Sequence, residues 1–391
     1  MIINGERALA YPVEIEEIKP IPNYDRVEHA RVGGWWVIVQ KEQFKVGDKA
    51  LYIEADSLVP SDDERFAFLE KKHYKVKTMK MCKVYSQGLL LPISEFPEIA
   101  DKEIHEDVTK LLSIKYYIEE DNARKAKTNP NEKYNRMCAR NPKLAKKPWF
   151  KWFMKRMWGR KLLFVFFGSK KDNPKKWPVW IKKTDEDRIE NVMFMLDDKN
   201  PYVVTEKIDG TSTTVFLDLT GRKPDFGVCS RNVRQMDMNA KNFHSEEVGD
   251  NVYWEMAIKY NMQDALNDIA KRYGYKRVAI QGETYGAKLQ GNPLKLDDRR
   301  FAAFNLVVDG VRLGSIVAKD ILAKYDIPFV PIIDEHYILP DQDELEEFKK
   351  SADGKSVINK KCMREGFVYR SMDGQKSFKN VSRKFLISKG E

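Results

Sequence analysis

The first 110 residues alternate between short apolar runs and turn-forming pieces. Apolar or alternating runs occupy residues 8–18, 34–40, 50–55 and 88–93, and pieces such as IPNYDR and KVGDK separate them. Runs of this length and spacing indicate short β-strands. The pattern predicts a small barrel, for which the oligonucleotide-binding (OB) type is the commonest among nucleic-acid readers. A β-module that only braces its neighbour is the alternative.

The C-terminal half mixes two periodicities. Strands are predicted at 202–217, onward to about 232, and at 277–286, 300–308 and 366–370. Helices are predicted at 183–192, where Thr184 is a candidate N-cap ahead of acidic residues, and at 242–273, 314–325 and 341–350. Strands interrupted by helices without strict β–α–β alternation indicate an α+β domain.

The stretch from Tyr202 to Leu217 carries the clearest chemistry. It reads as two β-branched runs joined by a tight turn at Asp209 and Gly210. Lys207 and Asp209 alternate about Ile208, so both side chains should lie on one face. A lysine at a strand end is a candidate nucleophile. Its ordinary pKa is about 10.4, so attack near neutral pH requires burial or a nearby positive charge, such as a divalent metal. A simple hairpin with a Lys–Asp pair is the competing interpretation.

The net charge of +10 is concentrated in one segment. Residues 124–183 contain 20 Lys and Arg against two acidic residues, and five of the eight tryptophans. Cations interleaved with aromatic rings suit a phosphate backbone with stackable bases. A solvated linker and an interfacial membrane helix are the alternatives. The apolar run at 162–167 is far too short to span a bilayer, which needs about 20 residues.

The four cysteines argue for a reducing compartment. They are widely scattered and form no CxxC pair, which speaks against a zinc site or a disulfide framework. The N-terminal residues contain acids and no long apolar core, so we expect no signal peptide. These observations predict a cytoplasmic protein, or one in the host cytoplasm if the source is viral, without membrane association.

Five further motifs follow Lys207 in order. They are CSRN with Arg231, QGETYG with Glu283, FAAFNLVVDG with Phe301 and Phe304, REGFVYR with Glu365, and SFKNVSRKFL with Lys379. In this order they resemble the covalent nucleotidyltransferases, namely polynucleotide ligases and mRNA-capping enzymes. TEKIDGTS, the upstream KTDEDRIEN and SQGLLLPISEF in the first domain resemble one branch, the ATP-dependent RNA ligases of the Deinococcus and Naegleria type. Only 12 residues follow Lys379, whereas DNA ligases and capping enzymes carry a barrel after that strand.

The resemblance implies a fold, a reaction and cofactors. It implies an OB-type domain at 1–110, a basic aromatic-rich linker at 111–180 and an adenylyltransferase domain at 181–391. ATP would adenylylate the enzyme lysine, with Mg²⁺ or Mn²⁺ as the metal. The AMP would then pass to a 5′-phosphate, and a 3′-hydroxyl would displace it, in the repair of RNA ends or nicks. We expect a monomer that acts on RNA or on a nicked RNA/DNA duplex.

The resemblance also assigns roles to individual residues. Lys207 would carry the AMP, Lys379 would contact the α-phosphate, and Glu283 and Glu365 would bind the metal or its waters. Phe304 would stack on adenine, with Phe301 as an equal geometric candidate. The remaining expected nucleotide contacts are Glu206, Arg231 and Arg188. Ser377 stands where related ligases often have a lysine, so Lys376 or Lys384 is the candidate second phosphate contact. A nucleic-acid-binding protein with an inert transferase domain, or a DNA ligase or capping-type enzyme, is the alternative.

Overall fold

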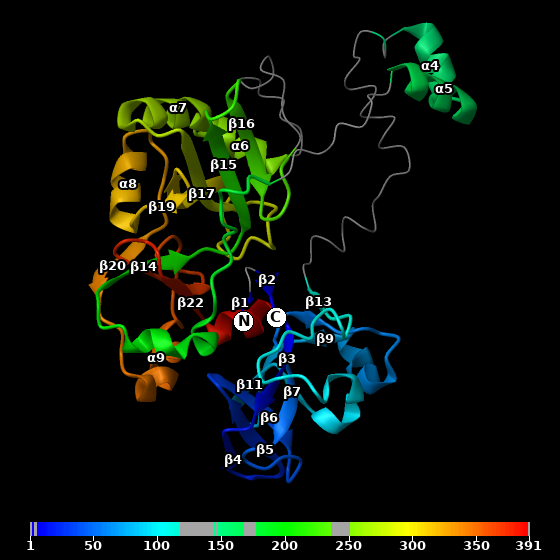
Figure 1. The fold of residues 1–391 in the computed structure, drawn as a ribbon, viewed down its shortest axis with the longest axis vertical. Helices are drawn as coiled ribbons and strands as arrows, with labels where there is room; N and C mark the ends of the chain where they lie inside the picture. Colours follow the sequence, from blue (N-terminus) through cyan, green and yellow to red (C-terminus); the bar gives the residue numbers. More distant parts are fainter. Residues whose placement is uncertain are drawn as a thin grey trace. The chain divides into compact units, whose positions relative to one another are not determined.

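The computed structural model describes residues 2–3, 6–117, 144, 147–167, 177–235 and 251–389 (Figure 1). The chain divides into two compact units. One unit contains residues 1–116 together with 176–391, and the other contains residues 117–175. Each unit is described by itself below.

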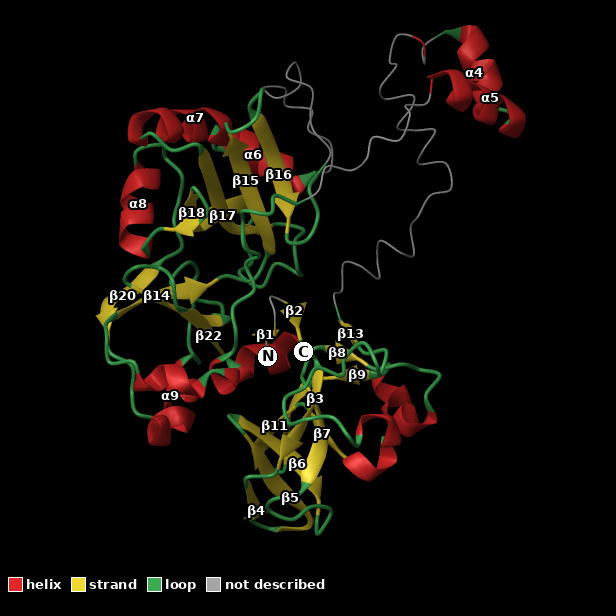
Figure 2. Ribbon diagram, in the orientation of Figure 1, coloured by secondary structure: helices red, strands yellow, loops and turns green. Residues whose placement is uncertain are grey.

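Short antiparallel strands build the N-terminal domain, as the sequence predicted (Figure 2). β12, β7 and β3 form one sheet, β4, β5 and β6 a second, β13, β8 and β9 a third, and β10 pairs with β11. The strands are β1 (Ile2–Ile3), β2 (Glu6–Arg7), β3 (Ala10–Glu14), β4 (Glu17–Ile21), β5 (Tyr24–Val32), β6 (Trp35–Gln40), β7 (Lys49–Ile53), β8 (Ser57–Leu58), β9 (Lys75–Val76), β10 (Thr78–Met81), β11 (Val84–Gln87), β12 (Leu89–Pro92) and β13 (Lys115–Tyr116). Three 3₁₀ helices accompany them, η1 (Glu64–Lys72), η2 (Ile93–Glu95) and η3 (Pro97–Ile99).

Several strands of this domain are not predicted by the sequence pattern, and β5 is the longest of them. The pattern predicts a turn at IPNYDR, but the turn occupies only positions 22 and 23, and β5 begins at Tyr24. The first three residues of β5 are exposed, so its polar start carries no apolar alternation. Pairing with β4 and β6 on both sides holds this strand in place.

A five-stranded sheet forms the larger half of the C-terminal domain, in the order β16-β15-β17-β18-β19. Helices α6, α7 and α8 cover one face of it and share its apolar core (Figure 2). The elements are β15 (Thr211–Asp218), β16 (Asp225–Ser230), β17 (Arg277–Gly286), β18 (Arg299–Val308), β19 (Val311–Arg312), α6 (Val252–Lys259), α7 (Met262–Tyr273) and α8 (Ser315–Ala323). Trp177 and Trp180 pack against an apolar cluster that contains Phe216, Ala279 and Val307 of the same sheet.

A four-stranded sheet, β20-β14-β21-β22, forms the other half. Its core joins the strands to the 3₁₀ helices η4 and η5 and to helix α9. The elements are β14 (Tyr202–Lys207), β20 (Ile332–Tyr337), β21 (Gly366–Ser371), β22 (Ser377–Val381), η4 (Ile189–Asn191), η5 (Met193–Asp197), η6 (Gln342–Glu344), α9 (Leu345–Ser351) and α10 (Arg383–Lys389). The predicted α+β class with a preceding OB domain is therefore confirmed.

The two strands around Lys207 do not form a hairpin. β14 pairs with β20 and β21, whereas β15 pairs with β16 and β17. The chain therefore crosses from one sheet to the other between Lys207 and Thr211. Gly210 is required at this crossing, because a Cβ there would lie 2.3 Å from the carbonyl oxygen of Thr284.

The helix predicted at 183–192 is also wrong. Residues 182–187 are non-helical, Arg188 forms a parallel bridge with Lys379, and only the 3₁₀ turn η4 follows. The amide of Lys379 donates to the carbonyl of Asp187 at 2.7 Å, so pairing with β22 overrides the local N-cap signal. The predicted helix at 242–273 is two helices, α6 and α7; its first residues, 242–250, lie outside the described part of the chain.

The second unit contains two short helices, α4 (Pro148–Met154) and α5 (Met157–Phe167). Phe150 and Leu163 pack between them, while Trp149, Trp152 and Trp158 stay exposed. No helix in the described ranges has the length and apolar character needed to cross a bilayer.

Candidate active site

Lys207 ends strand β14 at the crossing between the two sheets. It pairs in the sheet with Gly366 of β21, which places the preceding residue, Glu365, beside it. The Nζ of Lys207 lies 2.5 Å from Oε1 of Glu365. Ile208 points the other way, into an apolar cluster with Tyr285 and Ala302. The sequence prediction that Lys207 and Asp209 share one side is consistent with this arrangement.

Two more carboxyl groups surround this lysine. Glu283 lies on β17, opposite Ser212 of β15, and Asp209 lies two residues after Lys207. Burial raises the pKa of Glu283 to about 8, with Glu365 and Asp209 adding to the rise and Lys207 opposing it. Burial and Glu365 likewise raise the pKa of Asp209 to about 6. The nearby cations therefore do not fully neutralise the negative charge of these carboxyl groups.

The carboxyl groups around Lys207 favour its charged form. Burial alone would lower the pKa of Lys207, but Glu365, Glu283 and Asp209 outweigh it, and the pKa lies well above its ordinary value. The ligand-free protein therefore lacks the nearby positive charge that attack by this amine requires. The carboxylates hold a proton on the amine, and only added positive charge can release it.

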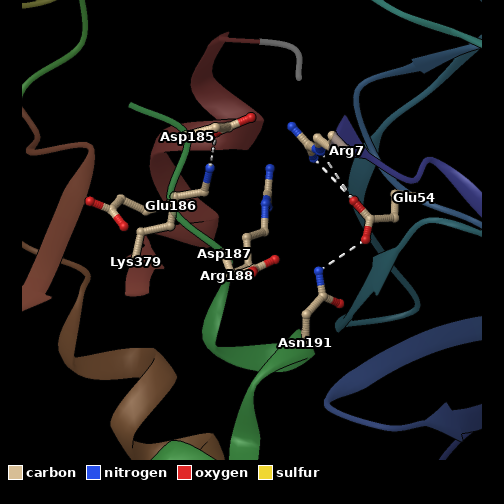
Figure 3. A pocket seen from close by; sticks show the side chains of 8 residues that line it. All are labelled: Arg7, Glu54, Asp185, Glu186, Asp187, Arg188, Asn191 and Lys379. Carbon is tan, nitrogen blue, oxygen red and sulfur yellow. Dashed lines mark hydrogen bonds and ion pairs between the residues drawn. The ribbon is translucent and has the colours of Figure 1, made fainter. Parts of the chain in front are cut away.

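A second cationic group lies on strand β22. Lys379 Nζ contacts Oδ1 of Asp185 at 3.1 Å (Figure 3). A guanidinium nitrogen of Arg231 contacts Oδ2 of the same carboxylate at 2.7 Å. Burial lowers the pKa of Lys379, Asp185 opposes that effect, and the nearby charge of Arg7 adds to it. Burial would raise the pKa of Asp185, but Lys379 and Arg231 hold it far below its ordinary value. Lys379 and Arg231 thus converge on one anion.

Arg188 lies in the same pocket but takes its partner from the OB domain. Its guanidinium donates to Asp56 at 2.8 Å and is almost fully buried. Arg7 of the OB domain also reaches this pocket, where it contacts Glu54 at 3.2 Å, and Figure 3 shows Arg7, Arg188 and Lys379 directed into one space. Burial opposes the charge of Glu54, yet Arg7 and its neighbours bring the pKa of Glu54 down to about 2. The OB domain therefore contributes Arg7 and Glu54 to the lining of this pocket.

The two candidate aromatic residues lie on opposite sides of β18. Phe301 is fully buried in the core under the helices. Phe304 is half-buried beside the cluster that contains Ile208 and Ala302, and the guanidinium of Arg370 lies 5.6 Å from its ring. Because Ala302 pairs with Glu283, this is the side of the strand that faces the carboxyl groups. The geometry favours Phe304 over Phe301 as the residue available to a base.

Glu206 contributes to the wall of the site rather than to its charge. Its Oε2 accepts a hydrogen bond from the amide of Val357 at 2.8 Å, and its own amide donates to the carbonyl of Pro331.

The two other lysines considered for phosphate binding lie elsewhere. Lys376 pairs with Asp198 and Lys384 with Asp353, and both side chains are more than half exposed.

The donor set fits a hard divalent cation in part. Oε2 of Glu365 is buried and has no hydrogen-bond partner among the described residues. Together with Glu283 and Asp209 it offers carboxylate oxygens, which Mg²⁺ prefers. Within the described ranges, no group of three or more acidic, cysteine or histidine side chains forms a complete metal site. Mg²⁺ commonly binds through one or two carboxylates, with waters and substrate phosphates completing its shell.

Two residues of this site were missed by the sequence analysis. Asp185 belongs to the quoted motif KTDEDRIEN but was taken as a helix-start acid. Asp185 contacts both Lys379 and Arg231 in the folded protein. This contact depends on the bridge between Arg188 and Lys379, which the sequence does not indicate. Arg7 had no signal in the sequence, because Asp185 and Lys379, which line the pocket with it, lie more than 170 residues later in the chain.

Comparison with known proteins agrees with this geometry. Residues 9–93 match a model of an OB-fold domain, and residues 200–385 match the model of the RNA ligase family. No curated protein shows a significant sequence match. Among solved structures, Naegleria gruberi RNA ligase with pyrophosphate is 26% identical, with a TM-score of 0.73 over 98% of this chain and 99% of that one. A glutamate-to-alanine variant of that ligase with ATP and Mn is 25% identical, with a TM-score of 0.74 over 98% and 100% of the two chains.

The fold and the lysine-centred site define a covalent nucleotidyltransferase that follows an OB-fold domain. Within that class, residues 200–385 match the model of the RNA ligase family. Over nearly its whole length, the chain is similar to the Naegleria gruberi RNA ligase.

Proposed function

We propose that this RNA ligase joins a 3′-hydroxyl to a 5′-phosphate through an AMP carried on Lys207. The observation that supports this most directly is the placement of Lys207 against Glu365, beside Glu283 and Asp209. Nζ attacks the α-phosphorus of ATP, a P–N bond forms, and pyrophosphate leaves. The AMP then moves to a 5′-phosphate, and the 3′-hydroxyl displaces it to form the phosphodiester bond.

The charged groups around the site are consistent with these reaction steps. Attack requires a neutral amine, and a bound Mg²⁺ or Mn²⁺ held by Glu283 and Glu365 would supply the positive charge that lowers the pKa of Lys207. Lys379 offers a mobile cation for the α-phosphate oxygens, on which charge changes during phosphoryl transfer. Arg231 shares its anion with Lys379, so the two would contact neighbouring oxygens.

The remaining nucleotide contacts follow from position. Phe304 would stack on adenine, from the side of β18 that carries the carboxyl groups. Glu206 would shape the base pocket through its backbone, because its side chain already anchors Val357. Arg188 and Arg7 line the pocket that contains Lys379 and would attract the outer phosphates.

We further propose that the substrate is RNA or a nicked RNA/DNA duplex, that the role is repair of RNA ends or nicks, and that the enzyme acts as a monomer. The OB-fold domain supports nucleic-acid binding. The four cysteines are widely scattered and form no CxxC pair, which supports a reducing cytoplasm.

Labelling with ATP that carries the isotope on its α-phosphate tests this proposal. Wild-type protein should retain label through denaturation, Lys207→Ala should retain none, and Lys199→Ala, an exposed lysine paired with Asp341, should label like wild type. Label from GTP instead would indicate capping-type chemistry, and no label from any nucleotide would favour an inert transferase domain. Sealing of all-RNA, all-DNA and mixed nicks would then identify the substrate.

A further inference from the structure

Lys389, the last described residue, lies next to the catalytic crossing. Its Nζ is 2.5 Å from Oδ2 of Asp209, and it also donates to the carbonyl of Gln290 at 3.0 Å. Both side chains of the Lys389–Asp209 pair are more than four-fifths buried. The pair joins the C-terminal end of the described chain to the residue two positions after the proposed nucleophile.

The Lys389–Asp209 pair is electrostatically favourable. Asp209, Glu283 and Glu365 crowd around Lys207, and Glu365 disfavours the charge on Asp209. Lys207 is already engaged by Glu365. Lys389 is therefore the cation that offsets Asp209 and keeps its carboxylate at the crossing. An exposed ion pair contributes little to stability. When one partner of a buried pair is removed, the other is left as an uncompensated buried charge, which is strongly destabilising.

The position of the Lys389 ammonium is fixed by helix α10. Phe385 and Leu386 are buried, and Oγ of Ser382 accepts from the amide of Phe385 at 3.1 Å at the start of the helix. At the same end, Arg383 donates to Glu346 at 2.9 Å and lies 4.6 Å from the ring of Tyr85 in the OB domain. One helix therefore contacts the OB domain at its first residue and Asp209 at its last.

We propose that Lys389 is a positioning residue for lysyl-AMP formation, which holds Asp209 in place beside Lys207. This inference rests on the proposed function. Lys389 contacts no reacting atom; it acts through Asp209. Loss of its charge should slow transfer of AMP to Lys207 without weakening the binding of ATP.

Single-turnover labelling at a range of ATP concentrations tests this inference in the full chain. Lys389→Met should lower the maximal rate by on the order of tenfold or more, as a displaced catalytic group does, and leave the half-saturating ATP concentration unchanged. Lys389→Arg should restore most of the rate because it keeps the charge. Lys350→Met, which replaces an exposed lysine of helix α9 that is paired with Glu347, is the control and should label at the wild-type rate.

Thermal unfolding of each variant separates positioning from folding. Rates are compared well below every unfolding midpoint. A slow Lys389→Met rescued by arginine, at a temperature where it is fully folded, supports the inference. A wild-type rate in Lys389→Met overturns it, and so does a slow rate that tracks the unfolding midpoint and is not rescued by arginine. If wild-type protein itself takes no label, the proposed function fails instead.

Discussion

The nucleotide pocket and the α4–α5 unit both gather cations, but they do so in opposite ways. In the pocket, Lys207, Lys379 and Arg188 each contact a carboxylate within about 3 Å and are largely buried. In the α4–α5 unit, Lys151, Lys155 and Arg156 are exposed, and residues 147–167 contain no acidic residue at all. The cations of the pocket are paired with its own carboxylates, whereas residues 147–167 offer no acidic side chain to pair with theirs.

The two arrangements suit different kinds of ligand. Paired, buried cations act in one geometry on one small anion, because each is fixed by its neighbours. Exposed cations beside exposed tryptophans suit a long polyanion, which needs many weak contacts rather than one exact fit. Arg156 lies 3.7 Å from the ring of Trp152, so charge and aromatic surface are offered together on α4. We propose that the α4–α5 unit contacts RNA.

The largest expected effect lies in the pocket. Lys379→Met should reduce lysyl-AMP formation by on the order of a hundredfold or more, because it removes a preorganised charge from the α-phosphate. Lys376→Met, three residues earlier in the chain, is the matched control: its side chain is exposed and paired with Asp198. Rates of AMP labelling compare the two variants. If both variants lost labelling rate to a similar extent, the buried ion pairs of the pocket would have no special importance for the reaction.

The pocket was predictable from sequence to the extent that its residues lie in ordered motifs. Lys207, Glu283, Glu365 and Lys379 were identified because each lies in one of the ordered motifs, and in the fold Lys207 interacts electrostatically with the other three. The side-by-side placement of Lys207 and Glu365 follows from one strand register, which the sequence does not contain.

The rest could not be predicted, for physical reasons. Asp185 looked like a helix-start residue, but pairing with β22 fixed an extended chain there instead. Arg7 and Lys389 reach the site from near the two ends of the described chain. No local pattern marks either side chain, because their partners Glu54 and Asp209 lie 47 and 180 residues away. The hairpin at Asp209 failed because both strand runs had better partners in separate sheets.

The second effect lies in the α4–α5 unit. Replacing Lys151, Lys155, Arg156 and Lys161 together with glutamine should lower RNA affinity about tenfold. It should also make the slope of log affinity against log salt shallower by up to about 3, since each phosphate contact on a single strand contributes about 0.7. AMP labelling of Lys207 should not change. The measurement is RNA binding by the full chain across salt concentrations.

The matched control for this variant replaces Lys319 and Lys324 of the α8 region, which lie outside both sites, with glutamine. An unchanged salt slope in the four-residue variant would return the α4–α5 unit to a linker. Loss of AMP labelling in it would contradict the separation between the two regions.

An effect on stability, rather than on activity, is expected from the raised pKa of Glu283 in the pocket. The pKa of Glu283 is raised to about 8, so its carboxyl stays protonated in the folded protein while it ionises near its ordinary value in the unfolded chain. The stability that this protonation provides is fully present below the ordinary pKa and is lost as pH rises towards 8. Ligand-free wild-type protein should therefore lose stability relative to Glu283→Gln by up to about 1 kcal/mol per pH unit across that window. Denaturant unfolding of both proteins between pH 5 and 8 measures the difference, and parallel curves would show that this pocket, like the α4–α5 unit, carries no buried charge penalty.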